Sequence, residues 1–183
     1  MATKRRQNTI LKETIIPIDF FLKDVLYVAP LLLGKYLVRK FENGKILKSI
    51  ITEVEAYRGE EDLACHASKG KTPRTEVMYK IGGHIYVYLI YGMYYMFNIV
   101  TGNENEPQAV LIRSTEIIQG PGRLTKTFQI DKSFNGKLLV PETKLWIENS
   151  NLQVDFYTTP RIGIEYAKEW KLKPWRYVAK SYK

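Results

Sequence analysis

Alternating hydrophobic and polar positions recur along the chain and predict β-strands, because successive side chains on a strand point to opposite faces. The clearest case is residues 35–57, where two such runs flank Asn43-Gly44, a dipeptide typical of tight hairpin turns. Further strand-like runs follow, with few helical segments between them. We therefore predict an α+β fold, with short helices around a mostly antiparallel sheet.

A few segments have helical rather than strand-like patterns. Residues 19–34 predict one or two short helices with Asp24 as an N-cap, and Pro30 argues against one unbroken helix across it. The stretch "GPGRLTKTFQI" predicts a short helix opened by Gly-Pro-Gly, and "EYAKEW" predicts a helical turn among the last strands. These helices are too short to form a domain of their own.

An uncharged stretch from Ile81 to Asn103 is long enough to raise the question of a membrane span. It contains several glycines, His84 and Asn98, and its tyrosines run through the centre rather than only at the ends. Its Tyr, Val and Ile content favours strands, with a bend or hairpin tip at Gly92. We predict no membrane span here.

The charge balance of the 183-residue chain is strongly basic, with 28 Lys and Arg against 19 Asp and Glu and a net charge of +9. Such a field favours nucleic acid or an anionic membrane surface, although a basic chain without such a partner remains an alternative. The chain length predicts a single domain. We expect a basic, flexible N-terminal arm over residues 1–18 and one domain over residues 19–183.

Soft metal ligands are scarce in this chain. Cys65 is the only cysteine, so an intramolecular disulfide is excluded, and two histidines with one cysteine are too few for a typical structural zinc site. We expect neither a metal nor another cofactor. The N-terminal residues form no clean apolar segment of the secretory type, so we expect a cytoplasmic location.

Two carboxylates, Glu53 and Glu55, lie two residues apart in a predicted strand, which places both on one face. Paired carboxylates can divide acid and base roles, and the alternative is a solvated strand face. Apolar neighbours and a following histidine-bearing loop make a general base here a reasonable candidate. Cys65 and His66 are adjacent and point apart, which disfavours a nucleophilic dyad. His66 is either a pocket residue or a loop histidine with satisfied hydrogen bonds.

The tyrosines of "HIYVYLIYGMYYMFNIV" occupy both faces of a predicted strand, so they cannot all pack in one core. Tyr91 and Met93 flank the glycine of the tip, and an exposed tip on a basic protein suits a wedge between base pairs. Other tyrosines are either core residues or walls of a slot that stacks a flat, cationic ring. Asn98 and Arg113 are polar groups in or at the end of strands, and Arg113 is able either to pair with a glutamate or to bind a phosphate.

Several motifs occur together in one order: "EVEAYRGEEDLACHAS", "TPRTEVMY", "IYVYLIYGMYYMFNIV", "AVLIRSTE", "GPGRLTK" and "PRIGI". With them, from about Phe20 to Tyr177, the chain resembles the alkyladenine (3-methyladenine) DNA glycosylase family, most closely its bacterial members. The combination of E-x-E-A-Y, A-x-H and Y-x-Y-x-x-Y-G-M-Y-x-x-x-N carries this resemblance, because any one motif alone is not specific.

The resemblance implies a catalytic pair and an aromatic slot. Glu55 matches the general base that activates the attacking water, and Arg113 matches the arginine that helps to hold this water. Tyr57, His66 and Tyr88 match the aromatic walls that stack on the extruded base. These roles are implied by the family resemblance, and the residue pattern alone does not assign them.

The resemblance also implies contacts to the base edge and to the duplex. The backbone around Ala64 matches the contacts that read the edge of the base. Asn98 matches an asparagine at the pocket mouth that helps to exclude normal purines bearing an exocyclic amine. Tyr91 matches the wedge that enters the minor groove, with Met93 and Tyr94 beside it on the DNA face. The family fold implied is a single compact domain with a curved sheet and a protruding hairpin that inserts into DNA.

The activity implied is that of a monofunctional DNA repair glycosylase. Such an enzyme turns alkylated or deaminated purines out of duplex DNA and hydrolyses the N-glycosidic bond, leaving an abasic site. The implied partner is double-stranded DNA with damaged purines. We expect a monomer without an obligate protein partner, in the nucleoid of a bacterium rather than in a nucleus.

Two other classes of function remain as alternatives, and the sequence departs from the family pattern at one connection. The alternatives are a non-catalytic binder of damaged DNA and a carbohydrate-acting hydrolase that uses Glu53 and Glu55. The departure lies between Ile118 and Gly120, where larger family members carry additional residues. We expect a shortened connection there.

Overall fold

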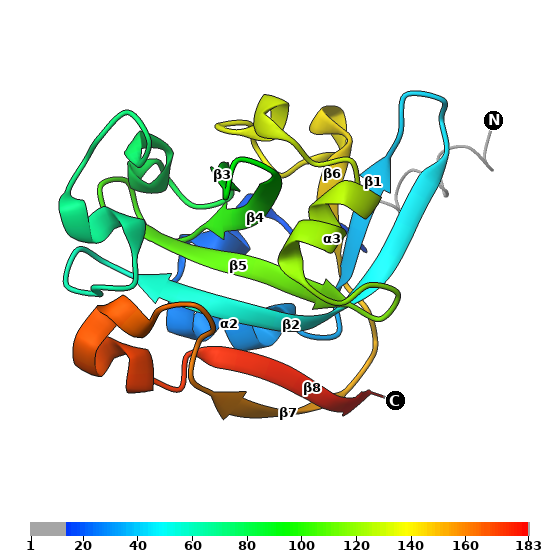
Figure 1. Cartoon of the computed structure of the whole chain (residues 1–183). Coiled ribbons are helices and arrows are strands. Elements are labelled where there is room, and N and C mark those ends of the chain that lie inside the picture. The colour runs from blue at the N-terminus through cyan, green and yellow to red at the C-terminus, as the bar shows by residue number, and fades with distance from the viewer. Residues whose placement is uncertain (1–13, 183) are drawn as a thin grey trace.

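The computed structural model describes residues 14–182, which form one compact body around a curled sheet (Figure 1). The paired strands of the described residues are antiparallel, in the order β3-β4-β5-β2-β1-β6, and β8 and β7 follow along the other side of β2. The predicted α+β class with a curved antiparallel sheet is confirmed. The strands are β1 (Tyr36–Lys40), β2 (Ile46–Arg58), β3 (Ile85–Ile90), β4 (Tyr94–Val100), β5 (Gln108–Thr115), β6 (Leu145–Glu148), β7 (Val154–Thr159) and β8 (Arg176–Tyr182).

Strand β2 is the centre of the sheet. Its first half pairs with β1 through the predicted hairpin, in which Gly44 has φ +83° and its N–H donates to the Phe41 carbonyl at 2.9 Å. Its second half lies between β5 and β8. In that half Val54 and Ala56 are fully buried in the main core, and the alternating residues on the other face include Glu55. The hairpin prediction is confirmed.

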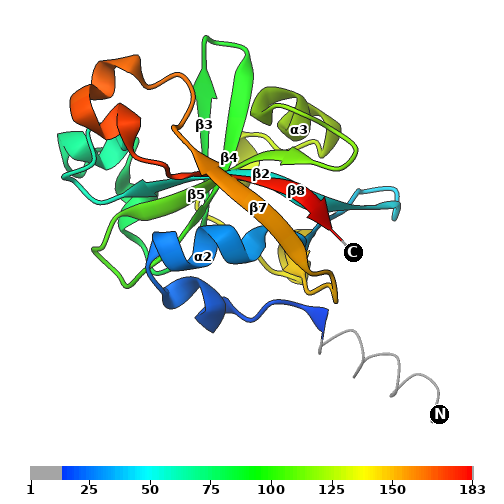
Figure 2. The ribbon, with the colours of Figure 1, turned by 90° about the horizontal axis from the view of Figure 1, so that it is seen from below.

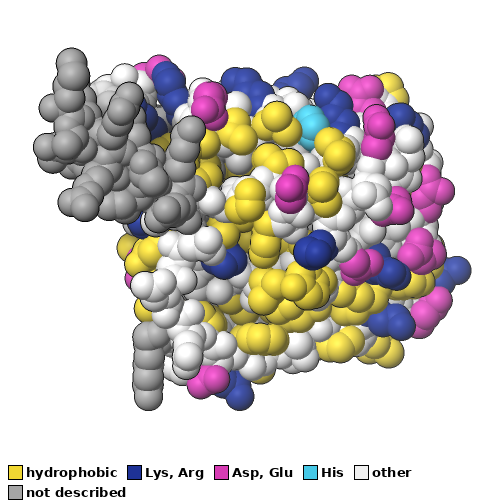
Figure 3. Space-filling view, turned by 180° about the vertical axis from the view of Figure 1, so that it is seen from behind, with side chains coloured by type: hydrophobic (Ala, Val, Ile, Leu, Met, Phe, Trp, Pro, Cys, Tyr) yellow, Lys and Arg dark blue, Asp and Glu magenta, His cyan; other side chains and the backbone are white. Residues whose placement is uncertain are grey.

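Helix α2 (Val25–Leu32) packs on β2 and β5 behind the sheet, after the short 3₁₀ helix η1 (Ile18–Leu22). The Asp24 carboxylate accepts a 2.8 Å hydrogen bond from the Leu26 N–H, which confirms the predicted N-cap. The expectation that Pro30 interrupts the helix is wrong. Pro30 lies in the last turn of α2, and the chain breaks earlier, at Lys23 and Asp24. A view from behind shows hydrophobic side chains gathered on that face (Figure 3).

The hairpin of β3 and β4 protrudes from the body and points away from α2 (Figure 2). At its tip Tyr91 and Gly92 have φ +53° and +67°, and the Met93 N–H donates to the Ile90 carbonyl at 3.2 Å. Two successive residues with positive φ give the tight reversal that an antiparallel pair needs. The tip side chains are therefore carried out into solvent.

Helix α3 (Pro121–Thr127) packs on β4 and β5. Gly122 allows the helix backbone to lie close to Tyr94 of β4. A Cβ at Gly122 would lie 2.9 Å from a ring carbon of Tyr94, so a larger residue would push the helix away. The connection that precedes α3 is short. It closes as a tight turn in which the Thr115 N–H donates to the Ile118 carbonyl at 2.9 Å.

Loops and 3₁₀ helices complete the described part of the chain. The helical turn predicted for "EYAKEW" is present but kinked at Lys168, which has φ +49°. The 3₁₀ helices after β2 are η2 (His66–Lys69), η3 (Glu76–Tyr79), η4 (Lys132–Phe134), η5 (Pro141–Thr143) and η6 (Glu165–Leu172). No helix of residues 14–182 is long and apolar enough to cross a membrane.

The predicted N-terminal arm lies mostly outside the described residues. Its last part, residues 14–18, pairs with the edge of β6 through a bridge between Ile15 and Glu148. The Ile16 side chain is buried, and its N–H donates to the Ile147 carbonyl at 3.0 Å. Residues 14–18 therefore pack with the domain.

Candidate active site

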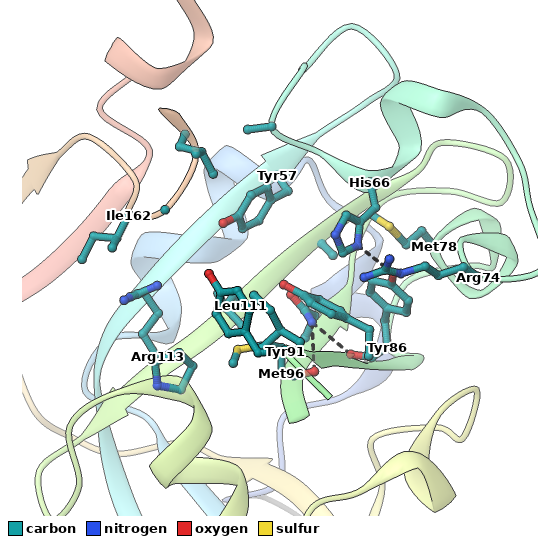
Figure 4. Close-up of a pocket in the computed structure, with 18 of the residues that line it drawn as sticks. Tyr57, His66, Arg74, Met78, Tyr86, Tyr91, Met96, Leu111, Arg113 and Ile162 are labelled. Atoms are coloured by element: carbon teal, nitrogen blue, oxygen red, sulfur yellow. Dashed lines mark hydrogen bonds between the residues drawn. The ribbon is translucent and has the colours of Figure 1, made fainter. Parts of the chain in front are cut away.

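One cavity of about 400 Å³ opens between the tip hairpin, the end of β2 and the segment before η6 (Figure 4). Its walls are mostly aromatic and aliphatic, with a few polar groups, which is typical of a small-molecule pocket. Most of the predicted site residues line it. These are Tyr57, Ala64, His66, Tyr88, Tyr91, Asn98 and Arg113.

Glu55 lies beneath the cavity wall and is fully buried. Its Oε1 accepts a 2.8 Å hydrogen bond from the Ile162 N–H, and its Oε2 accepts one of 2.8 Å from the Tyr57 hydroxyl. Arg113 Nη1 lies 3.3 Å from the same Oε2. A carboxylate has about four acceptor positions, so three donors leave one position open. The fourth position has no partner among the described residues.

Arg113 touches both carboxylates of the predicted pair. Its Nε donates to Glu53 Oε1 at 2.8 Å, while Nη1 faces Glu55. Glu53 Oε1 also accepts from Arg176 Nε at 2.6 Å, and its Oε2 accepts from the Ser114 hydroxyl at 2.8 Å. Burial raises the pKa of Glu53, but the hydrogen bonds and the positive charges of the two arginines bring it below the usual value. Glu53 is thus an ionised carboxylate with hydrogen-bond donors on both oxygens.

A buried ion pair sets the position of the segment that reaches Glu55. Arg161 Nη1 and Nη2 lie 2.6 and 2.8 Å from the two oxygens of Asp62, and both side chains are inaccessible to solvent. The guanidinium also donates to the Ala56 carbonyl at 2.8 Å and stacks 4.8 Å from the centre of the Tyr57 ring. This pair links the end of β2 to the neighbouring Ile162.

The sequence analysis did not find this ion pair or the Ile162 N–H. The motif "PRIGI" marked the segment, but nothing local indicated that a backbone N–H there would reach a carboxylate about one hundred residues away. Asp62 and Arg161 could have been suspected only as charged residues within two motifs that occur together.

The Tyr57 hydroxyl is held as a hydrogen-bond donor. Burial, followed by the negative charge of Glu55, raises the pKa of this phenol well above its usual value. The ring lines the cavity (Figure 4), and the hydroxyl donates to the Glu55 carboxylate. Tyr57 therefore combines a wall for a flat ligand with a fixed donor to Glu55.

His66 and Tyr88 form the facing aromatic wall. Their ring centres lie 4.5 Å apart at 72°, and His66 Nδ1 lies 2.9 Å from the Tyr86 hydroxyl (Figure 4). Burial, with the positive charges of Arg74 and Lys69, lowers the pKa of His66 to about 4. The imidazole is neutral at neutral pH, so it adds no positive charge to the slot.

Asn98 and Ala64 lie in the wall rather than at an open edge. The Asn98 side chain is buried, and its Nδ2 donates to the carbonyls of Tyr86 and Met96 at 3.1 and 3.3 Å. These two bonds hold the amide rigidly. The Ala64 carbonyl accepts a long 3.4 Å hydrogen bond from the hydroxyl of Tyr166, a lining residue that the sequence analysis missed.

The predicted tip residues are exposed, as the hairpin geometry requires. Tyr91 is 84% exposed, Met93 66% and Tyr94 46%, and only Tyr91 of the three lines the cavity. A bulky residue with positive φ is an uncommon and strained conformation. The fold therefore holds the Tyr91 ring outward at the pocket rim at some cost in stability.

Two alternative chemistries lose support from this geometry. Cys65 is buried, and burial raises the pKa of its thiol to about 12, so it is not an activated nucleophile. Glu53 is bound by two arginines and a serine, so it is not free to act as the second acid of a glycoside hydrolase. Among residues 14–182 no group of three or more His, Cys, Asp or Glu could hold a metal ion.

Comparison with known proteins gives a consistent result over nearly the whole chain. A family model described as methylpurine-DNA glycosylase matches residues 19–120 and 115–183. A protein of Borreliella burgdorferi (strain ZS7) is 47% identical over 90% of this chain and 95% of its own length. Proteins of Psychrobacter cryohalolentis and Methanocella arvoryzae are both 41% identical, over 87% and 91% of this chain and 91% and 93% of their own lengths. All three are named "Putative 3-methyladenine DNA glycosylase".

Proposed function

Because the chain belongs to the methylpurine-DNA glycosylase family, whose members hydrolyse N-glycosidic bonds in DNA, we propose that its pocket receives a methylated purine turned out of the duplex. The substrate class proposed is 3-methyladenine and related damaged purines. The observation that carries the proposal is Glu55, a buried carboxylate with one open acceptor position beside an aromatic slot. The family resemblance expected from the sequence is confirmed.

The proposed reaction uses Glu55 as a general base. A water donates a hydrogen bond to the open position of Glu55, and Arg113 helps to hold this water. Its oxygen bonds to the sugar C1′, its proton passes to Glu55, and the C1′–N bond breaks with the electron pair going to the base. A base methylated at N3 or N7 carries a positive charge and leaves as a neutral molecule. It is therefore a good leaving group without protonation.

The slot is proposed to select flat, electron-poor rings. Tyr57 lies on one side, and His66 with Tyr88 lies on the other, so a purine can stack between aromatic faces. Aromatic faces attract a cationic base, and a neutral His66 does not repel it. The Ala64 backbone is proposed to read the edge of the base. The rigid Asn98 amide is proposed to exclude normal purines with an exocyclic amine by steric contact.

The tip hairpin is proposed to open the duplex. Tyr91 would enter the minor groove and fill the space of the flipped nucleotide, with Met93 and Tyr94 against the DNA on either side. The exposure and strained φ of Tyr91 support this role, because strain of this kind tends to occur at functional positions. The protein is proposed to act as a monomer.

The decisive experiment incubates the protein with duplex DNA treated with a methylating agent and assays free methylpurines. Wild-type protein should release methylpurines and leave abasic sites that break only after alkali treatment. Glu55→Gln should abolish release while duplex binding stays close to wild type. Equal loss of binding and release would contradict the assignment of Glu55 as the general base. Binding of damaged duplex by wild-type protein without any base release would indicate the alternative, a non-catalytic binder.

A further inference from the structure

Glu53 is a partly buried carboxylate for which the reaction above has no role. It lies on β2 two residues before Glu55, and its side chain is only 14% exposed. Three donors from two other strands meet on it: Arg113 and Ser114 from β5, and Arg176 from β8. Like Glu55 it does not line the cavity, but both of its oxygens are bound by donors of the neighbouring strands.

The contact with Glu53 determines which part of Arg113 faces the base. Glu53 binds the Nε edge of the guanidinium at 2.8 Å, and only Nη1 lies within 3.3 Å of Glu55. A guanidinium without this restraint prefers to bind a carboxylate through two parallel hydrogen bonds. A second bond from Arg113 would occupy the last open acceptor position of Glu55 and displace the water.

Charge acts in the same direction as geometry. The Arg113 guanidinium lies between two carboxylates, with Nε 2.8 Å from Glu53 and Nη1 3.3 Å from Glu55. Charges interact more strongly in a buried site than in water. Without the Glu53 charge, Glu55 alone would draw the Arg113 guanidinium toward it.

We propose that Glu53 is a positioning residue: it holds the Arg113 guanidinium so that Glu55 keeps one acceptor position for the attacking water. The inference rests on the proposed function, because it assigns Glu53 a role through the catalytic pair. A purely structural role is the competing explanation, since Glu53 also joins β8 to β2 through Arg176.

The matched control for the structural role is Arg176→Gln. This change removes the link between β8 and Glu53 and leaves the Glu53–Arg113 contact in place. Glu53→Gln keeps the side-chain shape and removes the charge. If Glu53 works through Arg113, Glu53→Gln should slow base release in a single turnover by about 10- to 100-fold, the size of loss typical when a residue that orients a reacting group is changed. Arg176→Gln should remain close to wild type.

Binding and a double-variant cycle complete the test. The dissociation constant for duplex DNA with an abasic-site analogue should be nearly unchanged in Glu53→Gln, so that the loss appears in the rate alone. In an Arg113→Gln background, Glu53→Gln should cause no further loss of rate. Glu53→Asp, which keeps the charge, should recover part of the rate and provides the test if Glu53→Gln folds poorly.

The outcomes separate the two proposals. Equal rates for Glu53→Gln and wild type, equal losses for Glu53→Gln and Arg176→Gln, or the same loss in the Arg113→Gln background would each overturn the positioning role. Those results leave the proposed function intact if Glu55→Gln is inactive in the same assay. Wild-type protein that releases no methylpurine would overturn the proposed function and this inference together.

Discussion

The Tyr57 hydroxyl donates a 2.8 Å hydrogen bond to Glu55 Oε2, and the two residues are only two positions apart on β2. Side chains at this spacing lie on the same face of a strand. The bond joins a wall of the pocket to its buried carboxylate, so a ligand that stacks on Tyr57 lies directly beside Glu55. Several predictions about the site and its stability depend on this arrangement and on its neighbours.

Tyr57→Phe should keep the wall and remove the donor. Loss of a hydrogen bond to a buried charge should lower the free energy of unfolding by about 1.5–3 kcal/mol. Methylpurine release should also become slower, because Glu55 Oε2 retains only Arg113. Urea denaturation and a single-turnover assay measure the two effects. Tyr27→Phe, on the exposed face of α2, is the control and should change neither.

Tyr91→Asn should separate folding from activity. Asparagine tolerates positive φ better than tyrosine, so the free energy of unfolding should rise by about 1 kcal/mol. Methylpurine release from duplex DNA should fall, whereas release from a single strand should change little, since a single strand has no gap to fill. Thermal unfolding and parallel assays on the two substrates test this prediction. A destabilised variant, or equal loss on both substrates, would argue against it.

Gly92→Ala provides an independent test of the tip geometry. A Cβ at Gly92 meets no atom within 4 Å, so any loss of stability comes from its φ of +67° alone. We expect the free energy of unfolding to fall by about 1 kcal/mol. No loss in thermal unfolding would show that the tip adopts another turn.

Asp62→Asn should be among the most destabilising changes in the domain. It leaves the Arg161 guanidinium buried without its carboxylate, which costs about 3–5 kcal/mol. Methylpurine release should fall with it, because Ile162 loses its fixed position against Glu55. The control is Lys171→Met, which breaks an exposed pair with Glu165 and should change stability by less than about 1 kcal/mol. Similar denaturation midpoints for the two variants would contradict this assignment.

His66 should make the stability of the protein depend on pH. The pKa of His66 is about 4 in the folded protein and near 6.5 in an unfolded chain, so unfolding takes up a proton between these values. The stabilising contribution is complete above the unfolded value and is lost as pH falls through this window. The unfolding temperature of wild type should thus fall more steeply than that of His66→Asn. A His66→Asn profile as steep as that of wild type would contradict this assignment.

Much of the central strand and its hairpin could be predicted from local patterns. Alternation placed Glu53 and Glu55 on one face, and Asn43-Gly44 marked the turn, because both signals depend on neighbours in the chain. The expectation that Pro30 interrupts the helix was wrong because of tertiary packing. Packing of α2 against the sheet stabilises the helix up to Leu32 despite the proline.

The sequence by itself determined the fold class, the family, and many of the residues around the slot, because motifs and strand periodicity can be read along the chain. Only the tertiary structure decided which hydrogen bonds and ion pairs those residues form with one another. It brought the Ile162 N–H and Arg113 to Glu55, bound Glu53 to Arg176, and buried Arg161 against Asp62. These partners are about 60 to 120 positions apart, and their meeting depends on strand register and on long-range packing that no local pattern encodes.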